Sequence, residues 1–129
     1  AGLDPADHPV FSGNYRIDSG YELAMRAMSA KPRPTALLCG NDQMATGAYI
    51  ALARLGLRVP EDVSVVGYDD EPLAADLRPA LTTVRIPFYE MGRMAAQHTF
   101  GGTVEDLPAM TYLSCPLVAR ASTAPPPGQ

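Results

Sequence analysis

Two short polar stretches hold the residues of this sequence best suited to bind a ligand. Residues 39–42 (CGND) and 67–70 (GYDD) each follow an apolar run. In open sheets of parallel strands, ligands bind beyond the carboxyl ends of the strands, where the chain turns toward helix N-termini. An amide both donates and accepts hydrogen bonds, and a carboxylate accepts up to four, so Asn41 and Asp69 suit a ligand rich in hydroxyl groups.

Helix capping is the competing interpretation of the polar residues. Asp42 directly precedes the first residue of an expected helix, and Asp70 precedes a turn that Pro72 could open. Asn41 and Asp69 each lie one residue before these positions. We therefore expect Asp42 to cap the helix, while Asn41 and Asp69 face a ligand.

Catalytic patterns are absent from the sequence. It has no Gly-x-Ser-x-Gly elbow, no Cys near a His and no Gly-rich phosphate loop. A phospho-acceptor pocket built on Asp69 and Asp70 would need a Lys at another strand end, but Lys31 lies in a Pro-rich turn at the opposite end of the sheet. His8 and His98 lack partners at metal-ligand spacing. We expect no enzyme, no cofactor and no metal site.

The pattern of apolar residues predicts the elements that position these stretches. Residues 35–39 and 63–66 suit strands buried on both faces, and 81–85 and 110–118 suit extended segments. Helical spacing predicts helices over 19–29, 43–55 and 88–100, with one turn at Pro72. Alternating strands and helices predict right-handed βαβ units, hence an α/β fold with a Rossmann-like, mainly parallel sheet flanked by helices.

Composition and charge restrict the class of protein. The chain has 129 residues, 47% of them apolar, which is enough for one domain with a core. The net charge of -4, with no cluster of basic residues, argues against a nucleic-acid-binding surface. No apolar run approaches the roughly 20 residues that cross a bilayer. Cys39 and Cys115 lie far apart in sequence, which suits buried thiols in a reducing, cytoplasmic compartment.

Residues 34–96 resemble the effector-binding domain of lactose-repressor/galactose-repressor (LacI/GalR) transcription regulators. Three motifs occur in the family's order: Asn-Asp-x-x-Ala-x-Gly after a strand, Gly-x-x-Val-Pro-x-Asp-x-Ser-Val-Val-Gly-Tyr-Asp-Asp, and Pro-x-Leu-Thr-Thr-Val. The stretch LVARAST, residues 117–123, is similar to the family's usual close, and residues 13–28 carry a weaker likeness.

The resemblance implies a periplasmic-binding-protein-like fold of type I, present here as a partial domain. In that fold two Rossmann-like subdomains enclose the effector, and the chain crosses between them three times. Residues 1–123 would form the C-terminal part, mostly of the C-terminal subdomain, while about 86–106 would belong to the N-terminal subdomain. Residues 124–129 would be a disordered tail. The first strand and helix of the subdomain, and the helix-turn-helix that contacts operator DNA, would lie outside this chain.

Four ligand-binding residues follow from the resemblance. Asn41 and Asp69 correspond to hydrogen-bonding partners of the effector, and Tyr15 and Phe88 to aromatic walls against a sugar ring. Each aromatic has an alternative: Tyr15 could plug a strand-helix turn, and Phe88 could be a core residue or a staple at a helix start. The Arg that many members use to hold the ligand belongs to the missing helix.

The resemblance also implies a homodimer through the C-terminal subdomain. Its interface would use the helix after CGND and the turn after GYDD, through Ala45, Ala48, Tyr49, Leu52, Leu73 and Leu77. Small residues would let two helices pack closely. As a stripe at helical spacing, the same residues are also typical of the core of a single domain.

The function implied is the sensing part of a regulator, in which a small sugar or related metabolite controls operator binding. The alternative is a periplasmic sugar-binding protein of a transport system, which shares the two-lobed fold. The sequence of residues 67–84, GYDDEPLAADLRPALTTV, favours the regulator. We expect no membrane partner.

Overall fold

The predicted α/β class is confirmed in the computed structural model, which describes residues 9–100 and 110–126. Strand β1 (Ala36–Leu38) pairs in parallel with β2 (Ser64–Val66), and β3 (Thr83–Val84) pairs antiparallel with β4 (Leu117–Val118). Isolated parallel bridges join Val66 to Thr82 and Asp69 to Arg85. The chain around β3 therefore lies beside the chain of β2, and the arrangement is mainly parallel.

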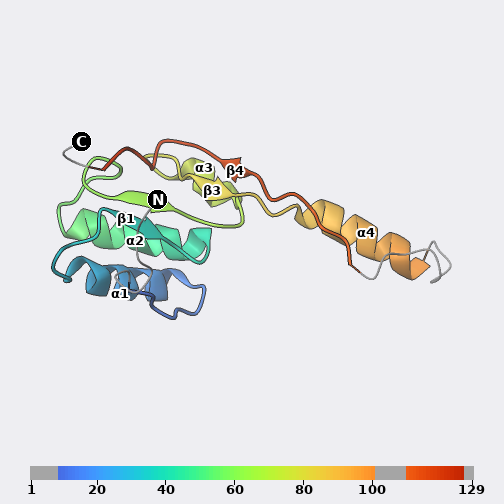
Figure 1. Cartoon of the computed structure of the whole chain (residues 1–129), viewed down its shortest axis with the longest axis horizontal. Helices are drawn as coiled ribbons and strands as arrows, with labels where there is room; N and C mark the ends of the chain where they lie inside the picture. Colours follow the sequence, from blue (N-terminus) through green and yellow to red (C-terminus); the bar gives the residue numbers. More distant parts are fainter. Residues whose placement is uncertain (1–8, 101–109, 127–129) are drawn as a thin grey trace.

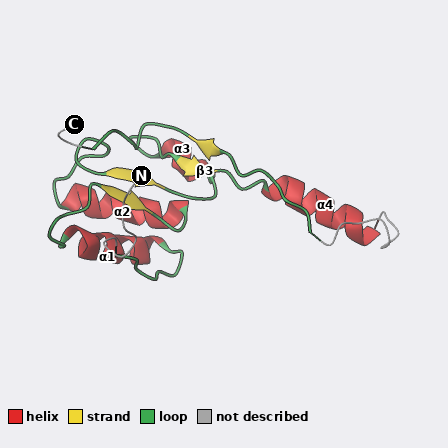
Figure 2. Cartoon of the chain, in the orientation of Figure 1, coloured by secondary structure: helices red, strands yellow, loops and turns green. Residues whose placement is uncertain are grey.

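Four helices accompany the strands: α1 (Ile17–Met28), α2 (Asp42–Arg54), α3 (Pro72–Asp76) and α4 (Phe88–Phe100). Figure 1 shows α1 and α2 stacked beneath β1 and β2, while α4 projects away at the far end of the chain segments that contain β3 and β4. Colouring by secondary structure makes the alternation of strands and helices along the chain easy to follow (Figure 2).

The predicted elements are present, with some differences. Helix α1 begins at Ile17, earlier than predicted, and the extended segment predicted over 110–118 contains only the short strand β4. Burial of β1 on both faces is wrong, because Leu38 is 82% exposed. Within the described residues β1 pairs only with β2, so its other edge and one of its faces stay open.

The core lies between α2 and the strands. Leu52 of α2, Val63, Val65 of β2 and Leu81 are all 0% exposed and belong to one apolar cluster. Ala27 and Met28 at the end of α1 join the same cluster. Helix α2 is thus held between the strands on one side and α1 on the other, and this fixes where its N-terminus points.

Helices α1 and α2 approach so closely that only glycine fits at their contact. A Cβ atom added at Gly20 would lie 2.6 Å from the Cα of Met44, and one added at Gly47 would lie 2.5 Å from the backbone nitrogen of Tyr21. Real side chains do not tolerate such distances to backbone atoms. The two glycines therefore set the spacing between the helices, and with it the path of the loop before α1.

We expect Gly47→Ala to lower the free energy of unfolding by about 1–3 kcal/mol, the usual cost of overpacking a tight contact. Gly92→Ala in α4 is the matched control, because a Cβ atom there meets nothing within 4 Å. The control should leave stability unchanged or raise it by up to about 1 kcal/mol through helix propensity. Urea unfolding of both variants measures the difference, and equal stabilities would contradict the close approach.

Candidate functional site

Asn41 caps helix α2, so the predicted assignment of the cap to Asp42 is wrong. The Asn41 side-chain oxygen accepts a hydrogen bond from the backbone nitrogen of Met44 at 2.9 Å. Its side-chain nitrogen donates to the backbone oxygen of Tyr15 at 3.1 Å. The helix begins at Asp42, one residue earlier than predicted, which moves the cap position to Asn41. An amide group carries a second N–H, and for this one no acceptor is found among the described residues.

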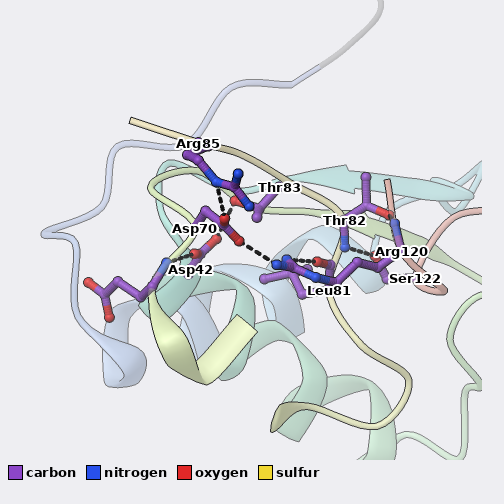
Figure 3. A network of polar contacts seen from close by, with 9 residues as sticks. Asp42, Asp70, Leu81, Thr82, Thr83, Arg85, Arg120 and Ser122 are labelled. Atoms are coloured by element: carbon purple, nitrogen blue, oxygen red, sulfur yellow. Dashed lines mark hydrogen bonds and ion pairs between the residues drawn. The ribbon is translucent and has the colours of Figure 1, made fainter. Parts of the chain in front are cut away.

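Asp42 instead joins three segments in the interior of the protein (Figure 3). Its side chain is 0% exposed and accepts hydrogen bonds from the backbone nitrogen of Glu71 at 2.8 Å and from the Thr83 hydroxyl at 2.6 Å. Its own backbone nitrogen donates to Tyr68 at 2.9 Å. A Cβ atom at Gly67 would collide with the Asp42 carboxylate, so the glycine of GYDD makes room for it. The carboxylate thus aligns the second polar stretch with the first.

Asp69 follows β2 with a backbone φ of 112°, a conformation that few residues other than glycine adopt. Its backbone nitrogen donates to the backbone oxygen of Val84 at 2.9 Å, and its backbone oxygen accepts from the backbone nitrogen of Ile86 at 3.3 Å. No group among the described residues donates a hydrogen bond to its carboxylate. Burial, together with the nearby carboxylates of Asp42 and Glu71, raises the pKa of Asp69 above its usual range. Such a carboxylate is ready to accept hydrogen bonds from a bound molecule.

The two candidate aromatic residues are exposed. Tyr15 is 67% exposed with a φ of 64°, and a Cβ atom at Gly40 would lie 3.5 Å from its ring. Phe88 is 59% exposed at the first residue of α4, so it is not a core residue of the described structure. The hydrogen bond from the Asn41 side chain to the Tyr15 backbone oxygen joins Tyr15 to the start of α2. Phe88 lies two residues after Ile86, whose backbone nitrogen donates a hydrogen bond to the backbone oxygen of Asp69.

The four candidate residues lie outside the two grooves of the described surface. The described surface has a groove of about 520 Å³ between α4 and the chain before β4, and one of about 920 Å³ between α1 and α2. Asn41, Asp69, Tyr15 and Phe88 line neither groove. Tyr15 and Asp69 share a left-handed backbone, a form of strain that tends to occur at functional sites.

The predicted interface residues divide into two groups. Ala45, Ala48 and Leu52 are at most 1% exposed and pack in apolar clusters of this chain, so the single-domain core interpretation holds for them. Tyr49, Leu73 and Leu77 are partly buried. These last three keep some surface that another protein could contact.

Metal and thiol chemistry have little support in the described structure. Across residues 9–100 and 110–126, no three His, Cys, Asp or Glu side chains gather where a metal ion could bind; His8 lies outside the described residues. Burial, with the nearby Asp42 carboxylate, raises the pKa of the Cys39 thiol to about 12. That thiol stays protonated at neutral pH and is a poor nucleophile.

None of the described helices is long and apolar enough to cross a membrane.

An α/β sheet with polar residues at the carboxyl ends of neighbouring strands has the architecture of Rossmann-like domains, in which ligands bind at that edge of the sheet. Comparison with known families agrees, because the model of the periplasmic binding protein-like domain matches residues 1–123. The transcriptional repressor PurR of Serratia proteamaculans is 44% identical over 95 residues, which cover 74% of this chain and 28% of that protein.

Solved structures give the same result. The structure of a dimeric Lac repressor with a C-terminal deletion superposes with a TM-score of 0.77 at 36% identity, covering 88% of this chain and 42% of that one. A LacI-family regulator from Enterococcus faecium with bound ribose gives a TM-score of 0.76 at 28% identity over the same shares. The chain belongs to the LacI/GalR family and is part of its effector-binding domain, as the resemblance indicated. It spans about a quarter of the length of the curated relatives it matches.

We expect Asp69→Asn to stabilise the fold at neutral pH. Because the pKa of Asp69 is raised on folding, its ionisation opposes folding above the folded-state pKa. The cost disappears as the pH falls below the unfolded value of about 3.9. The melting temperature of Asp69→Asn should therefore exceed that of the unchanged protein at about pH 7 and match it near pH 3.

The exposed Glu22→Gln serves as a control, with little effect at either pH. An equal gain for Asp69→Asn at both pH values would contradict an electrostatic cost at Asp69. Asparagine also adopts the left-handed conformation readily, so the backbone adds no penalty.

Proposed function

We propose that this chain supplies one wall of the effector cleft of a transcription regulator, and that a small sugar or related metabolite bound there controls operator DNA binding. The observation that carries the proposal is the Asp69 carboxylate, which has no hydrogen-bond donor among the described residues. It lies at the carboxyl end of β2, next to the strand end that holds Asn41.

The chemistry of the wall suits a sugar. Asp69 can accept hydrogen bonds from hydroxyl groups, and the free N–H of Asn41 can donate one. Tyr15 and Phe88 are exposed aromatic rings that can pack against the C–H face of a sugar ring. The related regulator from Enterococcus faecium is described with bound ribose, which supports a sugar as the class of effector.

The remaining wall belongs to a part of the protein outside this chain. Residues 1–123 would form the C-terminal part of the effector-binding domain, with about 86–106 in the N-terminal subdomain and 124–129 a tail. Helix α4 supports this division, because it has no buried residue and one of its faces lines the groove of about 520 Å³. That groove is lined by Pro87, Met91, Met94, Ala95, His98, Thr111, Leu113 and Cys115. Burying such an apolar surface requires further chain.

We expect the protein to act as a homodimer through its C-terminal subdomain, as the related Lac repressor is described as dimeric. Tyr49, Leu73 and Leu77 would contribute directly, together with the exposed Ile50 on α2. Operator DNA would be contacted by a separate N-terminal domain, which places the protein in the cytoplasm. Regulation then requires that the effector bind the two subdomain arrangements with different affinity.

The regulatory proposal is tested by operator titration of the full-length protein with and without a panel of sugars that begins with D-ribose. An active sugar should change the operator affinity. Asp69→Asn should weaken sugar binding by about 1–3 kcal/mol, because the ligand hydroxyls lose their charged acceptor. Calorimetry measures this loss in a variant that we expect to be fully folded. Sugar binding without any effect on operator affinity would contradict regulation and favour the transport alternative.

The division into subdomains is tested through Cys115, which lines the α4 groove and is exposed in the described structure, so the predicted burial of its thiol is wrong there. In the isolated 129-residue chain we expect Cys115 to react rapidly with a maleimide at neutral pH. In the full-length protein the groove should be covered, and the reaction should be at least tenfold slower, an order-of-magnitude expectation for a buried thiol. Cys115→Ala reports any background labelling. Equal rates in the two forms would contradict coverage of the groove.

A further inference from the structure

Asp70 makes two ion pairs directly beside the candidate ligand-binding residue. One of its carboxylate oxygens accepts from the Arg85 Nε atom at 2.7 Å, and the other accepts from the Arg120 Nη2 atom at 2.5 Å (Figure 3). The Asp70 side chain is only 8% exposed. Burial alone raises the pKa of the Asp70 carboxyl, but the hydrogen bonds from Arg120 and Arg85 outweigh burial and hold that pKa below its usual range.

The two arginines lie at the sheet ends of the two segments that connect the sheet with α4. Arg85 follows β3 at the start of the outgoing segment, and Arg120 lies just after β4, the strand at which the returning segment reaches the sheet. The backbone nitrogen of Arg85 donates to Pro116 at 2.9 Å, which joins the two segments to each other. Arg120 also donates to the Leu81 oxygen at 2.8 Å and, through its backbone, to the Thr82 hydroxyl at 2.9 Å. A single carboxylate therefore holds the start of the outgoing segment and the chain just after β4, where the returning segment joins the sheet.

Asp70 also bears on the direction in which the Asp69 side chain points. Asp69 and Asp70 are consecutive residues with φ values of 112° and 58°. Such conformations cost energy in residues other than glycine and persist only where the surroundings hold them. Asp69 is held by backbone bonds to Val84 and Ile86, which flank Arg85. Releasing Asp70 from its arginines removes the side-chain anchors of this turn.

We propose that Asp70 is a positioning residue that fixes the direction of the Asp69 side chain and the arrangement of the two segments leading to α4, so that each biases the other. The part about α4 stands without any ligand. The part about Asp69 rests on the proposed function, since it assumes that a ligand contacts this carboxylate. Coupling of this kind is reciprocal: a ligand held by Asp69 favours one arrangement of α4, and that arrangement favours the ligand.

The two arginines differ in how far their side chains are exposed to water, and so in how strongly each is expected to hold Asp70. The Arg120 side chain is 20% exposed, while that of Arg85 is 56% exposed. Water screens an exposed ion pair and weakens it. The Arg120 side chain also donates a hydrogen bond to the Leu81 oxygen at 2.8 Å, which the substitution removes as well. Loss of Arg120 should therefore disturb the arrangement more than loss of Arg85.

The test measures the distance between α2 and α4 in the full-length protein. Spin labels at Ala53→Cys and Ala96→Cys, both at exposed positions, report this distance by pulsed electron paramagnetic resonance, in a background without other reactive cysteines. The unchanged protein should give one narrow distribution. Asp70→Asn should broaden or shift it, Arg120→Gln should do the same, and Arg85→Gln should have a smaller effect.

Arg93→Gln is the matched control. Arg93 pairs with Glu90 at 2.7 Å inside α4, so its loss removes an ion pair without touching the connecting segments. Its distribution should stay narrow. Arg120→Lys keeps the charge but loses the planar fork, and it should restore part of the narrow distribution. An unchanged distribution in Asp70→Asn with cooperative unfolding retained, or in Arg85→Gln where Asp70→Asn does not fold, would overturn the proposal. Arg85→Gln keeps the test decisive even if Asp70→Asn does not fold, because Arg85 is mostly exposed.

A second arm uses D-ribose as the probe. Where ribose binds the unchanged protein, Asp70→Asn should weaken its binding at least fivefold and remove any ribose-induced change in the distance. Retained affinity together with a retained distance change would overturn the coupling. Ribose that fails to bind the unchanged protein counts against ribose as the effector, and thus bears on the proposed function alone. The distance distributions still decide the role of Asp70.

Discussion

A buried carboxylate at the start of α2 is the constraint on which the rest of the site depends. Asp42 is removed from water, and its charge is offset by the Glu71 N–H, the Thr83 hydroxyl and its position in the first turn of the helix. These contacts bring the end of β2 and the start of β3 to the N-terminus of α2. Asn41 and Asp69 share one edge of the sheet because Asp42 links the segments on either side.

The elements could be predicted from sequence because each has a local pattern. The apolar spacing of α4 gave its bounds, and Pro72 marked the start of α3. Burial of β1 could not be predicted in the same way. A continuous apolar run indicates a strand covered on both faces, but the cover comes from other chain segments, and Leu38 has none within the described residues. Local patterns therefore reveal which segments form strands, while burial depends on what packs against them.

The site was predicted less completely, and the reason is the sequence distance between partners. Cap preferences alone could not distinguish Asn41 from Asp42, since both are good caps and only the start of the helix decides between them. The bond from Thr83 to Asp42 joins residues 41 positions apart, and that from Arg120 to Asp70 joins residues 50 positions apart. No periodicity encodes such pairs. The strand-end pattern and the family resemblance both indicated Asp69, yet the two arginines that hold its neighbour Asp70 became visible only in the fold.

Two adjacent carboxylates of one turn, Asp69 and Asp70, have opposite electrostatic environments. Asp70 is neutralised by two arginines and belongs to the framework, whereas Asp69 has no donor among the described residues and a raised pKa. Satisfying Asp69 internally would stabilise the fold but would remove the acceptor that a ligand needs. Leaving Asp70 unpaired would let the turn relax out of its left-handed conformation. The arrangement therefore concentrates the electrostatic cost on Asp69, which would recover it by binding under the proposed function, while the paired Asp70 belongs to the framework beside it.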